Sequence, residues 1–269
     1  MRKSLLFFTI LLFAAVRLHA APYQVKDSVL HIPSGTAKIS PRQFEDRKDF
    51  HTVVFDAPCA LKSIGDYAFL GCEKLREIKL PQSLTEIGEG AFRECVSLKE
   101  ITIPLRCRKL PRYVFSWCES LEKAVLPQSL LDIGSGCFSY CRKLRDINFP
   151  GALTHVGANA FSFCVSLREV KLPPTVTELE SYAFSECEAL ETATLPANNH
   201  LLGDLIFSGC SNLRNIRIGS KIPPAFDCNS TLFEENEREI YKICVLHVPA
   251  SAAEAYKEAP GWSLFENIE

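Results

Sequence analysis

The sequence predicts an α/β repeat solenoid with a parallel β-sheet on one face, short helical or irregular segments on the other, and capped ends. Three observations support this fold class. Phe, Cys and Leu each return seven times at a step of 23 residues, a Pro closes nearly every unit, and the end of each unit alternates like a strand. The repeated positions are Phe69, Phe92, Phe115, Phe138, Phe161, Phe184 and Phe207, then Cys72, Cys95, Cys118, Cys141, Cys164, Cys187 and Cys210, then Leu75, Leu98, Leu121, Leu144, Leu167, Leu190 and Leu213.

The first residues have the features of a signal peptide. Two basic residues precede an almost unbroken apolar run from Ser4 to Val16, and Ala20 and Ala21 are small residues suited to cleavage. The run is too short to span a bilayer comfortably. We therefore expect residues 1–21 to be removed, leaving a secreted, periplasmic or surface-bound chain with no membrane span.

Residues 22–58 are less regular and are expected to form an N-terminal cap with a degenerate repeat. We expect the first strand at residues 53–55, where two valines precede a phenylalanine. Ile39 and Phe44 are expected to belong to the degenerate coil. The seven regular repeats then occupy residues 59–219.

Each part of the repeat has an expected structural role. Ile78 and Leu80 alternate with polar residues, as the inward side chains of a short strand do. Pro81 has no backbone N–H to donate and ends the strand. Phe69 and Cys72 are expected to share one face of a short helical turn. One such coil cannot bury its apolar side alone, so successive coils must stack.

The C-terminal segment, residues 220–269, is expected to cover the open edge of the last coil. Pro223 and Pro224 break the repeat, and residues 251–258 have the pattern of a short helix that ends before Pro260 and Gly261.

The seven repeat cysteines are expected to be core residues. Cys72 lies at helical spacing from Phe69 and Leu75, and a buried free Cys behaves as a small hydrophobic residue. Seven cysteines cannot all pair with one another, and the chain has no C-x-x-C pair that would indicate a zinc site. The disulfide state of four others is open, with a bond between the last two as one alternative: Cys59, Cys107, Cys228 and Cys244.

Composition and motifs argue against several function classes. The formal net charge of −2 gives no basic excess for nucleic-acid binding. Nucleophile-elbow, H-E-x-x-H and phosphate-loop motifs are absent, and the S-x-x-K match at Ser120 contains the repeat's own Leu121. We therefore expect a protein that is not an enzyme and holds no cofactor or metal. An enzyme would need a concave pocket with convergent polar groups.

The repeat resembles the BspA-like leucine-rich repeats of bacterial surface proteins. The resemblance rests on units such as LPQSLTEIGEGAFRECVSLKEITIP at residues 80–104 and covers about residues 59–219. The segment VLHVPASAAEAYKEAPGWSLFENI is also similar to the C-terminal cap of these proteins. The resemblance implies a leucine-rich-repeat solenoid. Because family members are described as binding host-surface or extracellular-matrix proteins, it also implies an adhesin-like role.

Solenoids bind partners through equivalent positions of successive coils, so the outward strand positions, here called the strand face, are the first candidate site. The candidates on it are Glu77, Lys79, Glu100, Thr102, Lys123, Val125, Asp146, Asn148, Glu169, Lys171 and Arg217. A second candidate is an aromatic row that three consecutive coils place just before the repeat Cys: Trp117, Tyr140 and Phe163.

In the third coil the sign of the charge inverts at two neighbouring outward positions. Glu122 stands between two basic residues of the adjacent coils, and Lys123 stands between two acidic ones. Stacked neighbours are therefore expected to attract one another across the strands.

The expected partner is a protein or glycoprotein, with host extracellular matrix as the source that the family resemblance implies. One alternative is a carbohydrate-binding module, which would need the aromatic rings to be coplanar and exposed. The other is a structural envelope protein without a diffusible ligand.

Overall fold

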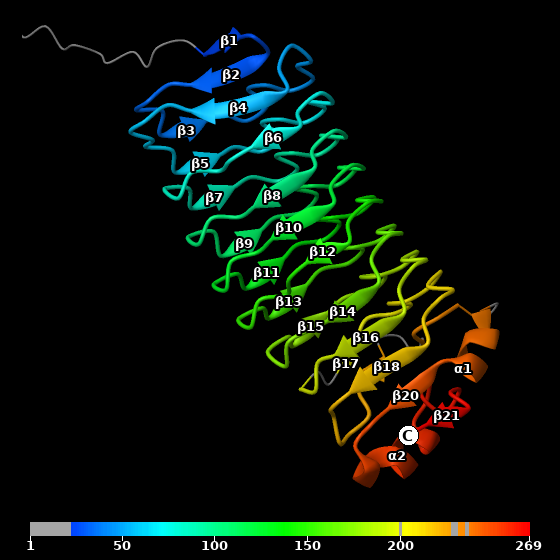
Figure 1. Cartoon of the computed structure of the whole chain (residues 1–269). Helices are drawn as coiled ribbons and strands as arrows, with labels where there is room; N and C mark the ends of the chain where they lie inside the picture. The colour runs from blue at the N-terminus through cyan, green and yellow to red at the C-terminus, as the bar shows by residue number, and fades with distance from the viewer. Residues whose placement is uncertain (1–22, 199–200, 227–230, 235–236) are drawn as a thin grey trace, which may run out of the picture.

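The computed structural model describes residues 23–198, 201–226, 231–234 and 237–269. The chain forms a parallel β-solenoid of about 10 turns with little helix. Its coils stack along one axis from the blue N-terminal end to the red C-terminal end (Figure 1). The expected signal peptide, residues 1–21, lies outside the described residues.

Successive coils contribute short strands to two columns that run along the solenoid (Figure 1). The first column contains β1 (Gln24–Lys26), β2 (Val29–Ile32), β4 (Thr52–Phe55), β6 (Glu77–Ile78), β8 (Glu100–Thr102), β10 (Lys123–Val125), β12 (Asp146–Ile147), β14 (Glu169–Lys171), β16 (Thr192–Leu195), β18 (Asn215–Ile218), β20 (Val245–His247) and β21 (Asn267–Ile268). The second column contains β3 (Lys38–Ile39), β5 (Ser63–Ile64), β7 (Glu86–Ile87), β9 (Lys109–Leu110), β11 (Asp132–Ile133), β13 (His155–Val156), β15 (Glu178–Leu179), β17 (Leu201–Leu202) and β19 (Ala225–Phe226).

The first column has the predicted alternation. Ile78 and Leu80 are buried, while Glu77 and Lys79 are exposed. Parallel pairing keeps equivalent residues in register, so Lys123 lies beside Glu100 on one side and Asp146 on the other. The expectation that the first strand lies at residues 53–55 is wrong, because β1 and β2 precede β4 in this column, with β1 antiparallel to β2.

The second column corrects the expectation of helical segments opposite the sheet. In Glu86–Ile87, Lys109–Leu110 and their counterparts, an outward residue precedes a buried apolar one. Two residues are too few for alternation to reveal a strand in the sequence. The Phe–Cys segment, expected to be a helical turn, is a hydrogen-bonded turn in which the Cys72 N–H donates to the Phe69 carbonyl at 3.2 Å.

Stacked phenylalanine rings form the centre of the core. Phe92 lies 5.2 Å from the Phe69 ring and 5.6 Å from the Phe115 ring, with interplanar angles of 6° and 5°. Phe44 continues this stack toward the N-terminus, and Ile39 pairs in register with Ile64. Ile39 and Phe44 therefore occupy the core positions of a coil before the regular repeats, as the sequence predicts.

The seven repeat cysteines are buried and free, which confirms their prediction as core residues. Each thiol donates to the carbonyl of the preceding coil's phenylalanine, as Cys95 does to Phe69 at 3.2 Å. Burial raises the pKa of Cys72 to about 12, so this thiol stays protonated at neutral pH. Cys59, Cys107 and Cys244 are also free, whereas Cys228 lies outside the described residues.

Tyrosines and glycines alternate at one left-handed position of successive coils. Tyr67, Gly90, Tyr113 and Gly136 have φ between 56° and 62°. A Cβ on Gly90 would lie 2.5 Å from the Tyr67 ring, and one on Gly136 would lie 2.5 Å from the Tyr113 ring. Each ring therefore occupies the space that a side chain on the next coil would need.

The hydrogen-bonded ladders of the two columns are interrupted. The first column divides between β6 and β8 and between β12 and β14, and the second divides between β7 and β9. The last division has a direct cause. Gly134 and its equivalents donate their backbone N–H to the preceding coil, as from Gly134 to the Leu110 carbonyl at 2.8 Å. In the coil of β9 the equivalent residue is Pro111, which has no N–H to donate toward β7.

The C-terminal segment packs on the last coils and contains the helices of the described chain: α1 (Glu239–Ile243), the 3-10 turn η3 (Ala250–Ala252) and α2 (Ala253–Glu258). The predicted helix at 251–258 is thus present as η3 and α2. Buried Tyr256 donates to the Ser220 carbonyl at 3.1 Å, and Trp262 donates to Pro224 at 2.8 Å. A capping role for both ends stays a prediction. In the described part of the chain no helix is long and apolar enough to cross a membrane.

We predict that Phe138→Ala lowers the free energy of unfolding by about 3–5 kcal/mol, as other buried Phe truncations do. Phe138 is fully buried, with ring neighbours Phe115 and Phe161 both at 5.3 Å. Urea denaturation followed by circular dichroism measures the change. Leu105→Ala is the control, because Leu105 is 62% exposed. A near-neutral effect of Phe138→Ala would contradict the role of the stack.

Candidate functional site

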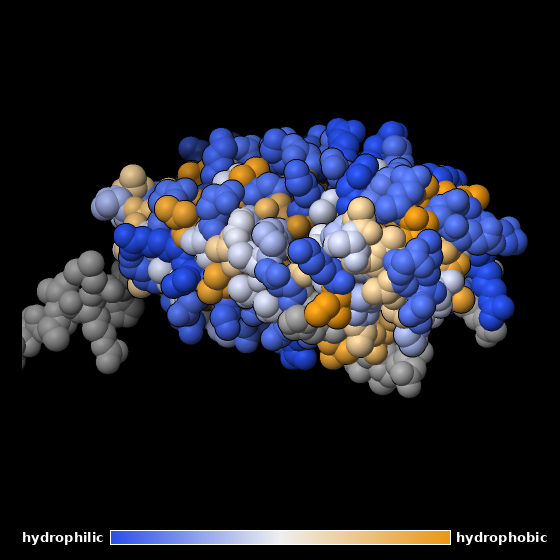
Figure 2. Space-filling model, turned by 90° about the horizontal axis from the view of Figure 1, so that it is seen from below, coloured by the Kyte–Doolittle hydropathy of each residue, from blue (hydrophilic) through white to orange (hydrophobic). Residues whose placement is uncertain are grey.

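The strand face is a continuous polar surface along the first column. Glu77, Glu100, Lys123, Asp146 and Glu169 point outward from β6, β8, β10, β12 and β14, and the second row of candidates lies two residues further along each strand. The candidates are exposed apart from Lys123 and Asn148, which are half-buried. In the view of Figure 2, hydrophilic residues cover much of the molecular surface, with hydrophobic ones interspersed.

The predicted charge inversion produces ion pairs between coils. Lys123 Nζ lies 2.7 Å from Asp146 Oδ2, and Arg145 Nη2 lies 2.5 Å from Glu122 Oε2. The hydrogen bond to Asp146 raises the pKa of Lys123. Such exposed pairs contribute little stability each, so their main effect is to neutralise the middle of the strand face.

One candidate on the strand face is bound within the scaffold. The Asn148 side chain donates to the Leu126 carbonyl at 2.9 Å and accepts from the Leu126 N–H at 2.9 Å. These two hydrogen bonds take the place of those that the backbone of a neighbouring strand would make with Leu126, just past the end of β10. A ligand contact by Asn148 would have to compete with these two hydrogen bonds, so Asn148 is better explained as a structural residue.

Two shallow depressions adjoin at the N-terminal half of the strand face. The first, between β6 and β8, has a volume of about 600 Å³ and includes Arg76, Glu77, Lys79 and Lys99 in its lining. The second, of about 380 Å³, lies over β4 and shares Glu77 and Lys79 with the first. The first coincides with the break in the ladder between β6 and β8.

The aromatic row is a face-to-face stack. The Trp117 and Tyr140 rings lie 4.0 Å apart at 5°, and the Tyr140 and Phe163 rings lie 4.4 Å apart at 11°. All three side chains are half-buried. The rings cover one another's faces, so they do not form the coplanar exposed platform that the carbohydrate alternative requires. The row is better explained as packing that shields the flank of the core.

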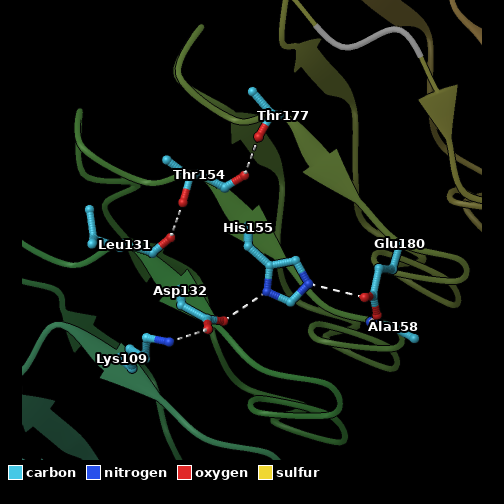
Figure 3. Close-up of polar contacts among 8 residues, drawn as sticks. All are labelled: Lys109, Leu131, Asp132, Thr154, His155, Ala158, Thr177 and Glu180. Carbon is cyan, nitrogen blue, oxygen red and sulfur yellow. Dashed lines mark hydrogen bonds and ion pairs between the residues drawn. The ribbon is translucent and has the colours of Figure 1, made fainter.

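The second column carries a polar cluster that the sequence analysis missed. Asp132, His155 and Glu180 come from three successive coils, with His155 between the two carboxylates (Figure 3). His155 Nδ1 lies 2.8 Å from Asp132 Oδ1, and Nε2 lies 3.1 Å from Glu180 Oε1. Lys109 Nζ lies 3.9 Å from the other Asp132 oxygen, and Glu180 also accepts the Ala158 N–H at 2.7 Å.

This cluster is a structural link between coils. Both ring nitrogens of His155 are bound to carboxylates, so neither is free to activate a nucleophile. Within the described residues, no group of His, Cys, Asp and Glu side chains is arranged to hold a metal ion. Partial burial lowers the pKa of His155, but the hydrogen bonds to Asp132 and Glu180 outweigh it and raise the pKa above its ordinary value.

Comparison with known proteins gives one family and several solved structures. The family model described as BspA type leucine rich repeat region matches in six copies over residues 37–164 and 132–235. Comparison with curated proteins gives no match.

Among solved structures, a leucine-rich repeat protein from Bacteroides ovatus has 27% identity and a TM-score of 0.56, over 85% of this chain and 64% of that one. One from Eubacterium ventriosum has 19% identity and a TM-score of 0.53, over 83% of this chain and 67% of that one. The pneumococcal vaccine antigen PcpA has 19% identity and a TM-score of 0.51, over 91% and 82%. This chain thus spans about two thirds of the Bacteroides and Eubacterium proteins.

We predict that His155→Gln destabilises the protein more at pH 5 than at pH 8. A raised folded-state pKa gives stability that is fully present below the unfolded pKa and is lost as the pH rises through the folded pKa. The difference should be on the order of 0.5 kcal/mol for a partly exposed pair. Urea unfolding at both pH values measures it. The control is Glu178→Gln, an outward residue of β15. An equal effect of His155→Gln at both pH values would contradict the charged link.

Proposed function

Since this chain belongs to the family of BspA type leucine rich repeat regions, we propose that it is a secreted or surface-associated, non-catalytic binding protein that recognises a protein or glycoprotein through its strand face. The proposal includes export with removal of residues 1–21. Host extracellular matrix is the first source of partners to test, because the family resemblance implies an adhesin-like role.

The observation that carries the proposal is the register of the first column. Parallel pairing lines up the outward side chains of successive coils, as it does for Glu100, Lys123 and Asp146. At roughly 4.8 Å per strand, seven coils present a surface on the order of 34 Å long. A long row of fixed, exposed polar side chains suits recognition of another macromolecule better than enclosure of a small substrate.

The charges of the strand face also suit a protein partner. Acidic, basic and neutral residues such as Glu169, Lys171 and Thr102 are interspersed and exposed, as at the polar rim of a protein interface. Trp117, Tyr140 and Phe163 stack on one another, which argues against a sugar-binding platform. The remaining alternative is a structural envelope protein that has no diffusible ligand.

We predict saturable binding of the purified protein to at least one member of a panel of extracellular-matrix proteins and glycoproteins, measured by surface plasmon resonance. Glu169→Lys with Lys171→Glu should weaken that binding at least tenfold, because it reverses two exposed charges of β14 without changing the net charge. Trp117→Ala tests the aromatic row.

The matched control reverses charges on the second column, with Lys109→Glu and Glu178→Lys, again at constant net charge. Loss of binding in this control, with normal binding by the β14 variant, would place the site on the other column. Absence of saturable binding to every panel member, which should include glycans, would favour the structural alternative.

A further inference from the structure

The depression between β6 and β8 lies at one of the two places where the ladder of the strand face is interrupted, the other being between β12 and β14. The two strands belong to separate hydrogen-bonded sheets, and the Lys99 N–H reaches the Arg76 carbonyl only at 3.5 Å. At the next interval the corresponding bond, from the Glu122 N–H to the Lys99 carbonyl, is 2.8 Å. The local separation of the strands accounts for the hollow of about 600 Å³ between them.

Charges in the lining of this depression are unevenly compensated. Of its two carboxylates, Glu77 lies 3.2 Å from Lys79, whereas Glu100 has no ion pair among the described residues, because its in-register neighbour Lys123 is bound to Asp146. Its other two cations, Arg76 and Lys99, have neither an ion pair nor a side-chain hydrogen bond within the described residues. The lining of the depression therefore holds three cations and two carboxylates, an excess of one positive charge.

Arg76 and Lys99 hold equivalent positions in successive coils, so their backbones are neighbours and their like charges repel. Further along the same row two positive charges are neutralised from an adjacent coil, Arg145 by Glu122 of the preceding coil and Arg168 by Glu191 of the next coil at 3.3 Å. Glu122 is also the neighbour of Lys99, but its carboxylate is bound to Arg145. An external carboxylate between Arg76 and Lys99 would relieve the repulsion.

The adjoining depression over β4 supplies apolar contact area beside these charges. Val54 is 40% exposed, Phe55 is half-buried, and both line this second depression together with Lys79. The two depressions meet at Glu77 and Lys79, so one occupant can lie across β4, β6 and β8. Its acidic groups would lie toward Arg76 and Lys99, and an apolar side chain would lie on Val54 and Phe55.

We propose that the depressions over β4, β6 and β8 form the docking site for an extended acidic segment of a protein partner, with a carboxylate of that segment bound between Arg76 and Lys99. This inference rests on the proposed function and assigns it a location and a partner chemistry. Exposed charge contacts of this kind weaken as the salt concentration rises.

The test measures binding of a fluorescein-labelled octaglutamate peptide to the purified protein by fluorescence anisotropy at low ionic strength. The wild type should bind octaglutamate and should not bind a neutral Gly-Ser peptide of the same length. Arg76→Glu with Lys99→Glu should raise the Kd at least tenfold, and added salt should weaken wild-type binding. Both residues are exposed, so the variant should melt close to the wild type.

The matched control is Arg168→Glu with Arg214→Glu, which changes two cations of the same row by the same net charge. It should change the Kd less than threefold. Equal weakening by both double variants would show attraction to overall charge and would overturn the proposal, as would failure of the wild type to bind octaglutamate. If a matrix protein still bound and the β14 variant lost that binding, the proposed function would stand and this location would be wrong.

Discussion

Each coil of this protein exposes an apolar side that only another coil can cover, and the rest of the structure depends on this constraint. The phenylalanine rings stack at 5.2–5.6 Å along the regular repeats from Phe69 to Phe138. Beside them, each repeat cysteine donates its thiol to the phenylalanine carbonyl of the preceding coil. Together the two rows fix the spacing and register between coils, and therefore fix where every outward side chain lies.

Because the register between coils is fixed, equivalent residues of successive coils form rows along the surface. The contacts between neighbouring side chains in these rows explain the features of the outer surface. Lys123 forms an ion pair with Asp146, and His155 lies between Asp132 and Glu180. The side chains of these rows therefore link successive coils as well as facing solvent. Trp117, Tyr140 and Phe163 stack so closely that they shield the core and leave no open ring platform. Arg76 and Lys99 differ because the row supplies them with no partner, and this difference locates the proposed docking site.

The 23-residue step allowed the stacking, the inward Ile78 and Leu80, and the buried cysteines to be predicted from the sequence. The second column was missed because strands such as Glu86–Ile87 are too short to show alternation. The cluster around His155 was missed because its members lie on three different coils, whereas catalytic motifs are recognised from residues close together in the sequence. The sequence did indicate part of this cluster, because an aspartate and a histidine stand at equivalent positions one repeat apart, 132 and 155. The orientation of the aromatic rings depends on packing that the sequence pattern does not specify.

The most direct test of the stacked core is the reactivity of its thiols. In a variant with Cys59→Ser and Cys228→Ser, every remaining cysteine is buried in the structure. If the cysteine row is buried as described, Ellman's reagent detects no reactive thiol in the native protein at pH 8, and all of the remaining thiols after unfolding in guanidinium chloride. Rapid reaction of several thiols in the native state would contradict the buried cysteine row, and with it the register from which the surface rows are derived.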